Sequence, residues 1–146
     1  MTTQLQTQWV VGFVDGEGCF HIGISHHSQC TLGYQVLPEF TVVQHSRDVQ
    51  VLHALKTFFG CGVVRRHGAT TCCYRVRHHT HLQTHIVPFF EKHPLRTKKR
   101  LDFIQFRRVL LWMDRGDHLT PEGLARIRNV QGRMNTRVCP EGRVDL

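Results

Sequence analysis

Two carboxylates lie two positions apart in the run Asp15-Gly16-Glu17-Gly18, directly after the apolar segment 9–14. A helix that ends here would gather unpaired backbone carbonyls and the negative end of its dipole, which favours a divalent cation. Mg²⁺ prefers oxygen ligands and keeps several waters, so one carboxylate, one carbonyl and a substrate phosphate would suffice. Two such helix ends side by side could hold two metals for in-line attack on a phosphodiester. Taken alone, however, this run is more often a turn with exposed acids.

The helix that would carry these acids is apolar nearly all round, from Trp9 to Val14, which predicts burial on more than one face. Its exit at Gly16 and Gly18 suits residues that leave the helical region at low steric cost. Small residues four apart allow close approach of a second helix, a rule drawn from membrane helices. We therefore expect a contact with a second copy of the chain, formed by Val10, Gly12, Phe13 and Gly16.

The charge of the chain points to a polyanionic partner. There are 19 Lys and Arg against 11 Asp and Glu, which gives a formal net charge of +8 and a pI near 9.7. We find no apolar run of about 18 residues and no signal peptide, so the expectation is an intracellular protein without a membrane partner.

A length of 146 residues favours one domain, 1–146, with a core from about 8 to 136, a polar head and a polar tail.

The cysteines and histidines do not form a recognisable metal motif. No two of the six cysteines have a two-residue gap, and neighbouring Cys72 and Cys73 would point to opposite faces of a strand. We interpret all six, including Cys139, as reduced thiols. Without cysteine partners, His78, His79, His81 and His85 are interpreted as solvated or phosphate-facing imidazoles rather than zinc ligands.

Hydropathy patterns predict an α+β chain in the order helix, strand, strand, helix, strand, strand, then helices. Alternation from Phe20 to Ser25 and from about Tyr34 to Gln44 predicts a hairpin turning near Gly33. A helix capped by Ser46 should follow and end at Phe59 and Gly60. A second hairpin is expected from Cys61–His67 and Cys72–His79, joined through Gly68, and then helices over His81–Lys92 with a break at Pro88, over Leu95–Met113 and from Thr120-Pro121.

One face of the predicted sheet carries mostly hydrogen-bond donors and bifunctional groups. In the last strand, Tyr74 and Val76 should point into the core, so Arg75 and Arg77 must point outward. Such a face is either an ordinary solvated surface or a β-ribbon reading a DNA major groove, where arginine commonly pairs with guanine. The candidate base-reading residues are His21, Ser25, His27, Gln35, Glu39, Thr41, Arg65, His67, Arg75 and Arg77.

The segment Trp9–Phe20 resembles the single motif of the LAGLIDADG homing endonucleases and its exit into the first strand. Supporting matches follow in order at Phe40–Gln44, Ile86–Phe90, Lys98–Phe103 and His118–Leu124. The resemblance implies a four-stranded antiparallel DNA-binding sheet. It also implies a homodimer, because the motif occurs once here and single-motif members resemble half of the two-motif monomers.

The resemblance also implies roles for individual residues. The metal-binding acid falls on Glu17, with the Gly16 carbonyl as a further ligand, and Mg²⁺ or Mn²⁺ is the expected cofactor. Asp15 belongs to the same metal-site motif, although its family counterpart more often supports the helix end. Gln44 would order water, and a basic residue near the scissile phosphate falls on Lys98 or Lys99, with Thr97 as the alternative.

The function implied is a site-specific, metal-dependent endonuclease that cuts a long, near-palindromic duplex across the minor groove, encoded by an intron. The alternatives are an RNA maturase acting on intron RNA and a non-cleaving DNA-binding protein of the same fold. A protein of this kind is expected in an organelle, chloroplast or mitochondrion, or in a bacterial cytoplasm. The sequence leaves the target site and the intron or intein origin open.

Overall fold

The computed structural model describes residues 4–136 of the chain. Its longer elements are α1 (Thr7–Glu17), β1 (Gly18–His26), β2 (Tyr34–His45), α2 (Val49–Phe59), β3 (Val63–Arg66), β4 (Thr71–Val76), α5 (Lys99–Asp114) and α6 (Pro121–Arg133). Shorter helical pieces are η1 (Ser46–Asp48), α3 (His79–His81), η2 (Leu82–Ile86), α4 (Val87–Lys92) and η3 (Asp117–Leu119). The expected α+β class and order of elements are confirmed.

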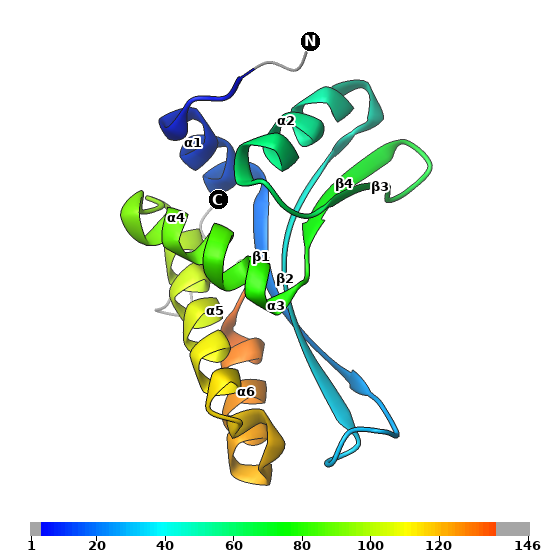
Figure 1. Ribbon diagram of the computed structural model, residues 1–146, viewed down its shortest axis with the longest axis vertical. Coiled ribbons are helices and arrows are strands. Elements are labelled where there is room, and N and C mark those ends of the chain that lie inside the picture. Colours follow the sequence, from blue (N-terminus) through cyan, green and yellow to red (C-terminus); the bar gives the residue numbers. More distant parts are fainter. Residues whose placement is uncertain (1–3, 137–146) are drawn as a thin grey trace.

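The four strands form an antiparallel sheet in the order β1-β2-β4-β3. The helices lie on one side of this sheet, and the β1–β2 hairpin extends away from them at the lower right of Figure 1. Because β1 and β3 are the edge strands, the strand that directly follows α1 pairs on one side only. The acidic end of α1 therefore opens into a sheet edge.

The core lies between the helices and the covered face of the sheet. Phe20 is fully buried at its centre, with ring centroids 5.1 Å from Phe40 and 5.3 Å from both Phe103 and Phe106. These rings come from β1, β2 and α5, so burial of aromatic area joins the sheet to the helix that follows it. The buried apolar residues around Phe20 form one continuous hydrophobic cluster within residues 4–136.

Several sequence predictions are confirmed. Tyr74 and Val76 are buried while Arg75 and Arg77 lie on the other face. Gly33 and Gly60 adopt positive φ angles of 78° and 75° at the hairpin turn and at the end of α2. At the start of α6, the Thr120 hydroxyl accepts a hydrogen bond from the Gly123 amide at 3.0 Å.

The exit from α1 differs from the prediction. The helix continues through Gly16 to Glu17, and Gly18 has an ordinary φ of −82°. A Cβ at residue 18 would lie 2.7 Å from a Val14 methyl carbon, so close packing, not backbone freedom, requires this glycine. Asp15 and Glu17 consequently lie on the last turn of α1 and not in a β-turn or loop after it.

The prediction that a helix begins at Leu95 was wrong, because α5 begins at Lys99. The amides of Arg96 and Thr97 donate to the carboxylate of Asp15 at 2.7 and 3.1 Å. These bonds hold residues 96 and 97 at the end of α1, and the helix starts after them.

Three smaller predictions are also corrected. Ser46 begins a short 3-10 turn, whose capping bond comes from the Arg47 amide to His45 Nδ1 at 3.1 Å. Pro88 does not interrupt the helical stretch, because the wider π turn η2 precedes it and its missing N–H falls in the first turn of α4. The strands of the second hairpin are shorter than predicted, 63–66 and 71–76.

Some predictions fall outside the described residues, namely those on Cys139, on the polar tail and on the first three residues of the polar head. The five cysteines between positions 4 and 136 are free thiols. Within that range, no helix is long and apolar enough to span a membrane.

Candidate active centre and nucleic-acid interface

Glu17 is the last residue of α1, and its side chain is exposed. Within residues 4–136 its carboxylate has no hydrogen-bond or ion-pair partner. Gly16 belongs to the same final turn, where backbone carbonyls lack an amide further along the helix. An unpaired carboxylate beside unpaired carbonyls is an oxygen donor set that fits a hard divalent cation.

Asp15, two residues earlier, is in a different state, because both of its carboxylate oxygens accept hydrogen bonds. Oδ1 accepts from the Thr97 hydroxyl at 2.6 Å and from the Thr97 amide, and Oδ2 accepts from the Arg96 amide. Burial alone raises the pKa of Asp15, but these hydrogen bonds and the charge of Lys99 outweigh it and hold the pKa below its ordinary value. Asp15 thus ties α1 to the segment before α5.

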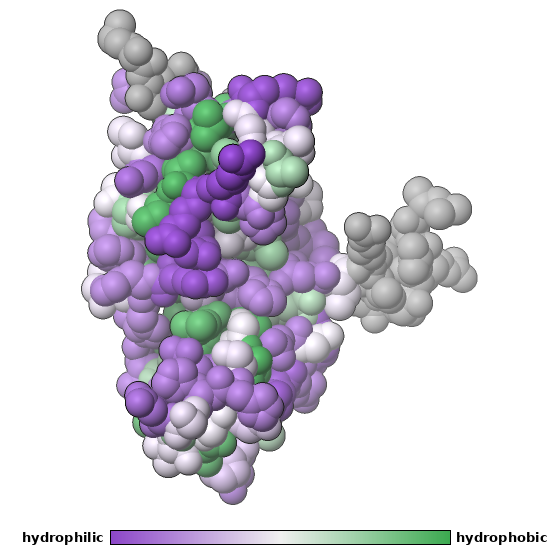
Figure 2. All heavy atoms as spheres, turned by 90° about the vertical axis from the view of Figure 1, so that its right-hand side faces the viewer, coloured by the Kyte–Doolittle hydropathy of each residue, from purple (hydrophilic) through white to green (hydrophobic). Residues whose placement is uncertain are grey.

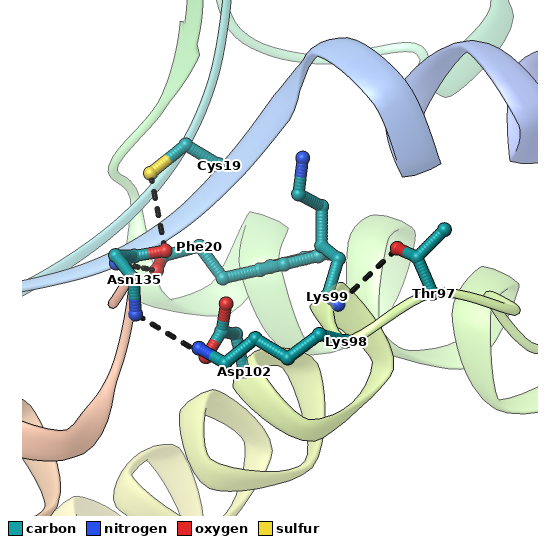
Figure 3. Close-up of polar contacts among 7 residues, drawn as sticks. All are labelled: Cys19, Phe20, Thr97, Lys98, Lys99, Asp102 and Asn135. Carbon is teal, nitrogen blue, oxygen red and sulfur yellow. Dashed lines mark hydrogen bonds and ion pairs between the residues drawn. The ribbon is translucent and has the colours of Figure 1, made fainter. Parts of the chain in front are cut away.

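Lys98 and Lys99 are adjacent, but they point to different places. The Lys98 ammonium pairs at 2.9 Å with the buried carboxylate of Asp102, one turn further along α5. Lys99 extends instead toward the junction of α1 and β1, as Figure 3 shows, and its charge acts on both Asp15 and Cys19. Thr97 is occupied by Asp15, so Lys99 is the cation that faces the acidic helix end.

A polar network next to this cation joins residues far apart in the chain (Figure 3). The Asn135 amide nitrogen donates to the Phe20 carbonyl at 2.7 Å, and its backbone N–H donates to Asp102 at 3.2 Å. Cys19 Sγ donates to Asn135 Oδ1 at 3.6 Å. Burial raises the pKa of the Cys19 thiol, although Lys99 opposes that change, so the thiol stays protonated near neutral pH.

Gln44 lies near the same junction, because Val42, two residues before it, pairs with Gly18. It is half-buried, and its amide donates to the Val43 carbonyl at 2.9 Å. Within the described residues it forms no hydrogen bond with Glu17. Its expected role in ordering water remains a prediction.

The ten candidate base-reading residues lie on one face of the sheet. The register places Ser25 opposite Gln35, His21 opposite Glu39, and Thr41 opposite Arg75. Arg65 is opposite Cys73 on the same face, and the remaining three continue this alternation just beyond the strand ends: His27, His67 and Arg77. Figure 2 looks at the side of the molecule that the helices leave open, and this surface is mostly hydrophilic.

Positive charge dominates one end of this face. Arg65, Arg75 and Arg77 border a depression of about 320 Å³ that His78 and His81 also line. The nearby carboxylate is Glu39, which accepts from Arg77 Nε at 2.7 Å. One acid against three guanidinium groups leaves a surplus of positive charge that suits a polyanion.

The exposed face of α1 is apolar and lined by glycine. Trp9 is 45% exposed and stacks on Phe13 with ring centroids 4.8 Å apart. A Cβ at Gly12 or Gly16 would meet no atom within 4 Å, so the fold of this chain does not require glycine at either position. Val10 is fully buried inside the subunit, so its predicted place in a contact with a second copy was wrong, and Trp9 occupies that face instead.

The histidine cluster consists of neighbouring rings, one pair tilted and the other edge to face. His78 and His81 have ring centroids 4.3 Å apart, and His81 and His85 5.8 Å. His79 instead forms a 2.8 Å contact with Asp114. In the part of the chain that the structure describes, no three His, Cys, Asp or Glu side chains converge on a point that could hold a metal.

The sequence did not predict roles for four residues near the site, Trp9, Cys19, Asp102 and Asn135. Trp9 could have been found from the helical spacing of residues 9, 12, 13 and 16. Asp102 has a weak local signal, the four-residue spacing from Lys98. For Cys19 and Asn135 no local signal exists, because their contact spans 116 positions.

Comparison with known proteins identifies the family. The family model for "LAGLIDADG endonuclease" matches residues 10–110, which include the acidic helix end, the sheet and most of α5. The chain belongs to the LAGLIDADG endonuclease family. The crystal structure of "a homing endonuclease, I-TnaI" is 55% identical, with a TM-score of 0.89, and covers 92% of this chain and 90% of that one.

A second solved relative is the meganuclease I-SmaMI, described as bound to cleaved DNA. It is 35% identical with a TM-score of 0.88, and the match covers 96% of this chain but 47% of that one. In sequence, a protein encoded in ND4 intron 1 of Podospora anserina is 35% identical over 118 residues. The "DNA endonuclease I-CvuI" of Chlorella vulgaris is 30% identical over 106 residues, 73% of this chain and 59% of that protein.

The chain spans only 24% to 28% of the length of the first four curated relatives. The part of this chain that the family model matches contains the acidic end of α1 and the whole sheet. The match to the I-TnaI chain covers most of both chains.

Proposed function

We propose that this chain is one half of a site-specific, metal-dependent DNA endonuclease that works as a homodimer. The observation that carries the proposal is the unpaired Glu17 carboxylate at the end of α1, two residues after the Asp15 carboxylate on which the charge of Lys99 acts, and at the edge of a basic sheet face. An acid and a cation at one edge of a polyanion-binding surface suit hydrolysis of a phosphodiester. The solved meganuclease bound to cleaved DNA supports the same function.

Each residue of the active centre has a separate role in this proposal. Glu17 and the Gly16 carbonyl would hold Mg²⁺ or Mn²⁺, which when bound supplies charge to stabilise the attacked phosphate. Lys99 places a second positive charge near the same phosphate, where negative charge develops as the bond breaks. Asp15 acts by holding residues 96–97, and hence Lys99, in place. Gln44 orders water at the junction.

The duplex lies on the outer face of the sheet in this proposal. Arg65, Arg75 and Arg77 contact base edges or phosphates, and the shorter polar side chains of β1 and β2 read the neighbouring base pairs. Two sheets related by a dimer axis would read a long, near-palindromic site, and the paired ends of α1 would cut across the minor groove. The intron-encoded relatives favour an organelle as the place of action.

The exposed face of α1 is the proposed contact between the two copies. Glycine at 12 costs about 1 kcal/mol relative to alanine in a helix interior, and no close contact within residues 4–136 requires glycine at 12 or at 16. Close approach of a second α1 explains both residues. Trp9 and Phe13, stacked on the same face, would supply buried apolar area.

A cleavage experiment tests this proposal. The substrate is a plasmid carrying the two DNA segments that flank the reading frame, joined without the insert. We expect cleavage of both strands with Mg²⁺ and specific binding without cleavage with Ca²⁺. Binding without cutting in any divalent metal would favour a DNA-binding protein, and retention of intron RNA in its place would favour a maturase.

Replacement of Gly12 tests the dimer separately. Gly12→Leu fits the isolated subunit, because the space beside it is open, but it would keep two α1 helices apart. Gly132→Leu on the exposed face of α6 is the matched control, since it also faces open space. Sedimentation should show a wild-type and control dimer and a Gly12→Leu monomer. A dimer in all three would refute the α1 contact.

A further inference from the structure

Glu17 and Lys99 come from elements that are distant in sequence, so something must fix the distance between them. Glu17 ends α1 directly before β1, whereas Lys99 begins α5. On one side of this junction, Asp15 holds the amides of residues 96 and 97. That tie fixes the chain before α5 but leaves the start of β1 without support on its free edge.

The support on the other side comes from the residues that follow α6. Asn135 donates its amide to the Phe20 carbonyl at 2.7 Å and accepts from the Cys19 thiol, so both residues at the start of β1 are held. Its backbone N–H donates to Asp102 at 3.2 Å. The same oxygen of Asp102 accepts from Lys98 at 2.9 Å.

Two features show that this arrangement is specific. Asp102 is 5% exposed and is the one buried charged residue in the described range 4–136. A buried carboxylate is costly unless it is paired and hydrogen-bonded, as it is here. Asn135 has a φ of 56° and is the one non-glycine residue at positive φ within that same range, a conformation asparagine tolerates better than most residues.

We propose that Asn135, Asp102 and Lys98 form a positioning clasp for the active centre. The clasp, which we define as Asn135, Asp102 and Lys98, joins the start of β1 to the start of α5 and thereby sets the position of Lys99 relative to Glu17. It also holds the Lys98 ammonium on the Asp102 carboxylate, so that Lys99 rather than Lys98 faces the scissile phosphate. This inference rests on the proposed function.

The clasp acts through Lys99 and Glu17 and touches neither DNA nor metal. Its removal should therefore slow the chemical step and leave DNA affinity unchanged. A displacement of about 1 Å in a catalytic group can cost about a hundredfold in rate, so a loss of roughly tenfold or more is expected.

The chain offers a matched control for Asn135. Gln131, one turn earlier on α6, donates its amide to the Ile22 carbonyl at 2.7 Å, the same kind of bond two residues further along β1. Asn135→Gly keeps the positive φ accessible and deletes the amide. Gln131→Ala deletes the comparable bond away from the active centre. A merely structural role would make the two variants alike.

The experiment measures single-turnover cleavage with Mg²⁺ and affinity with Ca²⁺ on the joined-flank plasmid described above. Asn135→Gly should cleave at least about tenfold more slowly with an unchanged Kd, whereas Gln131→Ala should match the wild type. Asp102→Asn should behave like Asn135→Gly, with Asp114→Asn at the far end of α5 as its control. Equal rates in the two members of each pair would overturn the proposal.

A second readout does not depend on nuclease activity. The Asn135 side chain accepts a hydrogen bond from the Cys19 thiol, so alkylation of Cys19, followed by peptide mass spectrometry, should be several-fold faster in Asn135→Gly than in Gln131→Ala. An inactive wild type would contradict the proposed function, and Cys19 reactivity would still decide whether the clasp holds the start of β1. Unchanged Cys19 reactivity, or faster alkylation with unaltered cleavage, would refute the clasp.

Discussion

The two faces of the sheet come from the same four strands, but they are determined by different physics. The covered face packs Phe20, Phe40 and Tyr74 against the helices, and none of the three is exposed. The outer face presents polar side chains from the alternate positions, such as His21, Thr41 and Arg75. Since successive residues of a strand point to opposite sides, neighbouring residues lie alternately in the apolar core and on the polar outer face.

The fold determines the residues of the covered face much more strongly than those of the outer face. Burial of apolar area requires large apolar side chains on the covered face, and few alternatives fill that space. Nothing in the fold requires arginine or histidine on the outer face, where substitutions change stability little. Function is therefore read from the residues that the fold does not explain, including Glu17 and the two exposed glycines of α1.

The largest effect should come from Glu17→Gln, which keeps the shape of the side chain and removes its charge. Cleavage should fall about a thousandfold or more, equal to roughly 4 kcal/mol of transition-state stabilisation, because the metal loses a charged ligand. Binding with Ca²⁺ and thermal stability should change little, since Glu17 has no partner within residues 4–136. Glu122→Gln on α6 is the control, and comparable loss of binding and cleavage would contradict the assigned role.

Phe20 and His21 are neighbours in β1 that lie on opposite faces of the sheet, so their replacement should affect stability differently. Phe20→Ala should destabilise the fold by about 3 to 5 kcal/mol, because it empties the centre of the aromatic core. His21→Ala, one residue away, should change stability by less than about 0.5 kcal/mol. Urea denaturation followed by circular dichroism measures both. Similar losses for the two variants would show that the outer face is part of the core.

On the outer face itself, Arg75 and Arg77 can be distinguished by the type of loss. If Arg75 pairs with a guanine, Arg75→Ala should lose roughly 1–3 kcal/mol on the preferred base and relax selectivity there only. Arg77 is already paired with Glu39, so Arg77→Ala should weaken all sequences alike and reduce the salt slope by about one unit. Binding to a target library at two salt concentrations measures both, and unchanged binding in both variants would place this strand off the DNA.

A smaller effect is expected from Asp15→Asn, with a defined pH dependence. The folded pKa of Asp15 lies below its ordinary value, so its ionised form stabilises the fold above that ordinary value and this stabilisation is lost as pH falls through the folded pKa. The variant should lose about 1–2 kcal/mol near neutral pH, from charge-assisted hydrogen bonds, and less below about pH 4. Asp48→Asn, an exposed pair with Arg47, should be nearly neutral. A pH-independent loss would contradict this assignment.

The sequence predicted those parts of the molecule that local patterns determine. Alternation placed Tyr74 inward and Arg75 outward, and Thr120-Pro121 marked the start of α6, because strand period and capping are local. The non-helical segment before α5 was missed, and its contact with Asp15 joins residues more than 80 positions apart, which no local pattern reveals. The sequence could not distinguish the roles of Lys98 and Lys99. Lys98 pairs with the Asp102 carboxylate, whose other partner is the backbone N–H of Asn135.

A mixed-dimer experiment tests the central claim most directly. The claim is that two chains pair through α1 and that each Glu17 serves the cleavage of one strand. Wild-type chains and tagged Glu17→Gln chains are co-expressed, the mixed dimer is isolated through its tag and a second tag on the wild type, and nicking of supercoiled target plasmid is followed with Mg²⁺. We expect nicked circles without linear product, at a rate near that of the wild type. Linear product from the mixed dimer, or no cleavage of either strand, would contradict it.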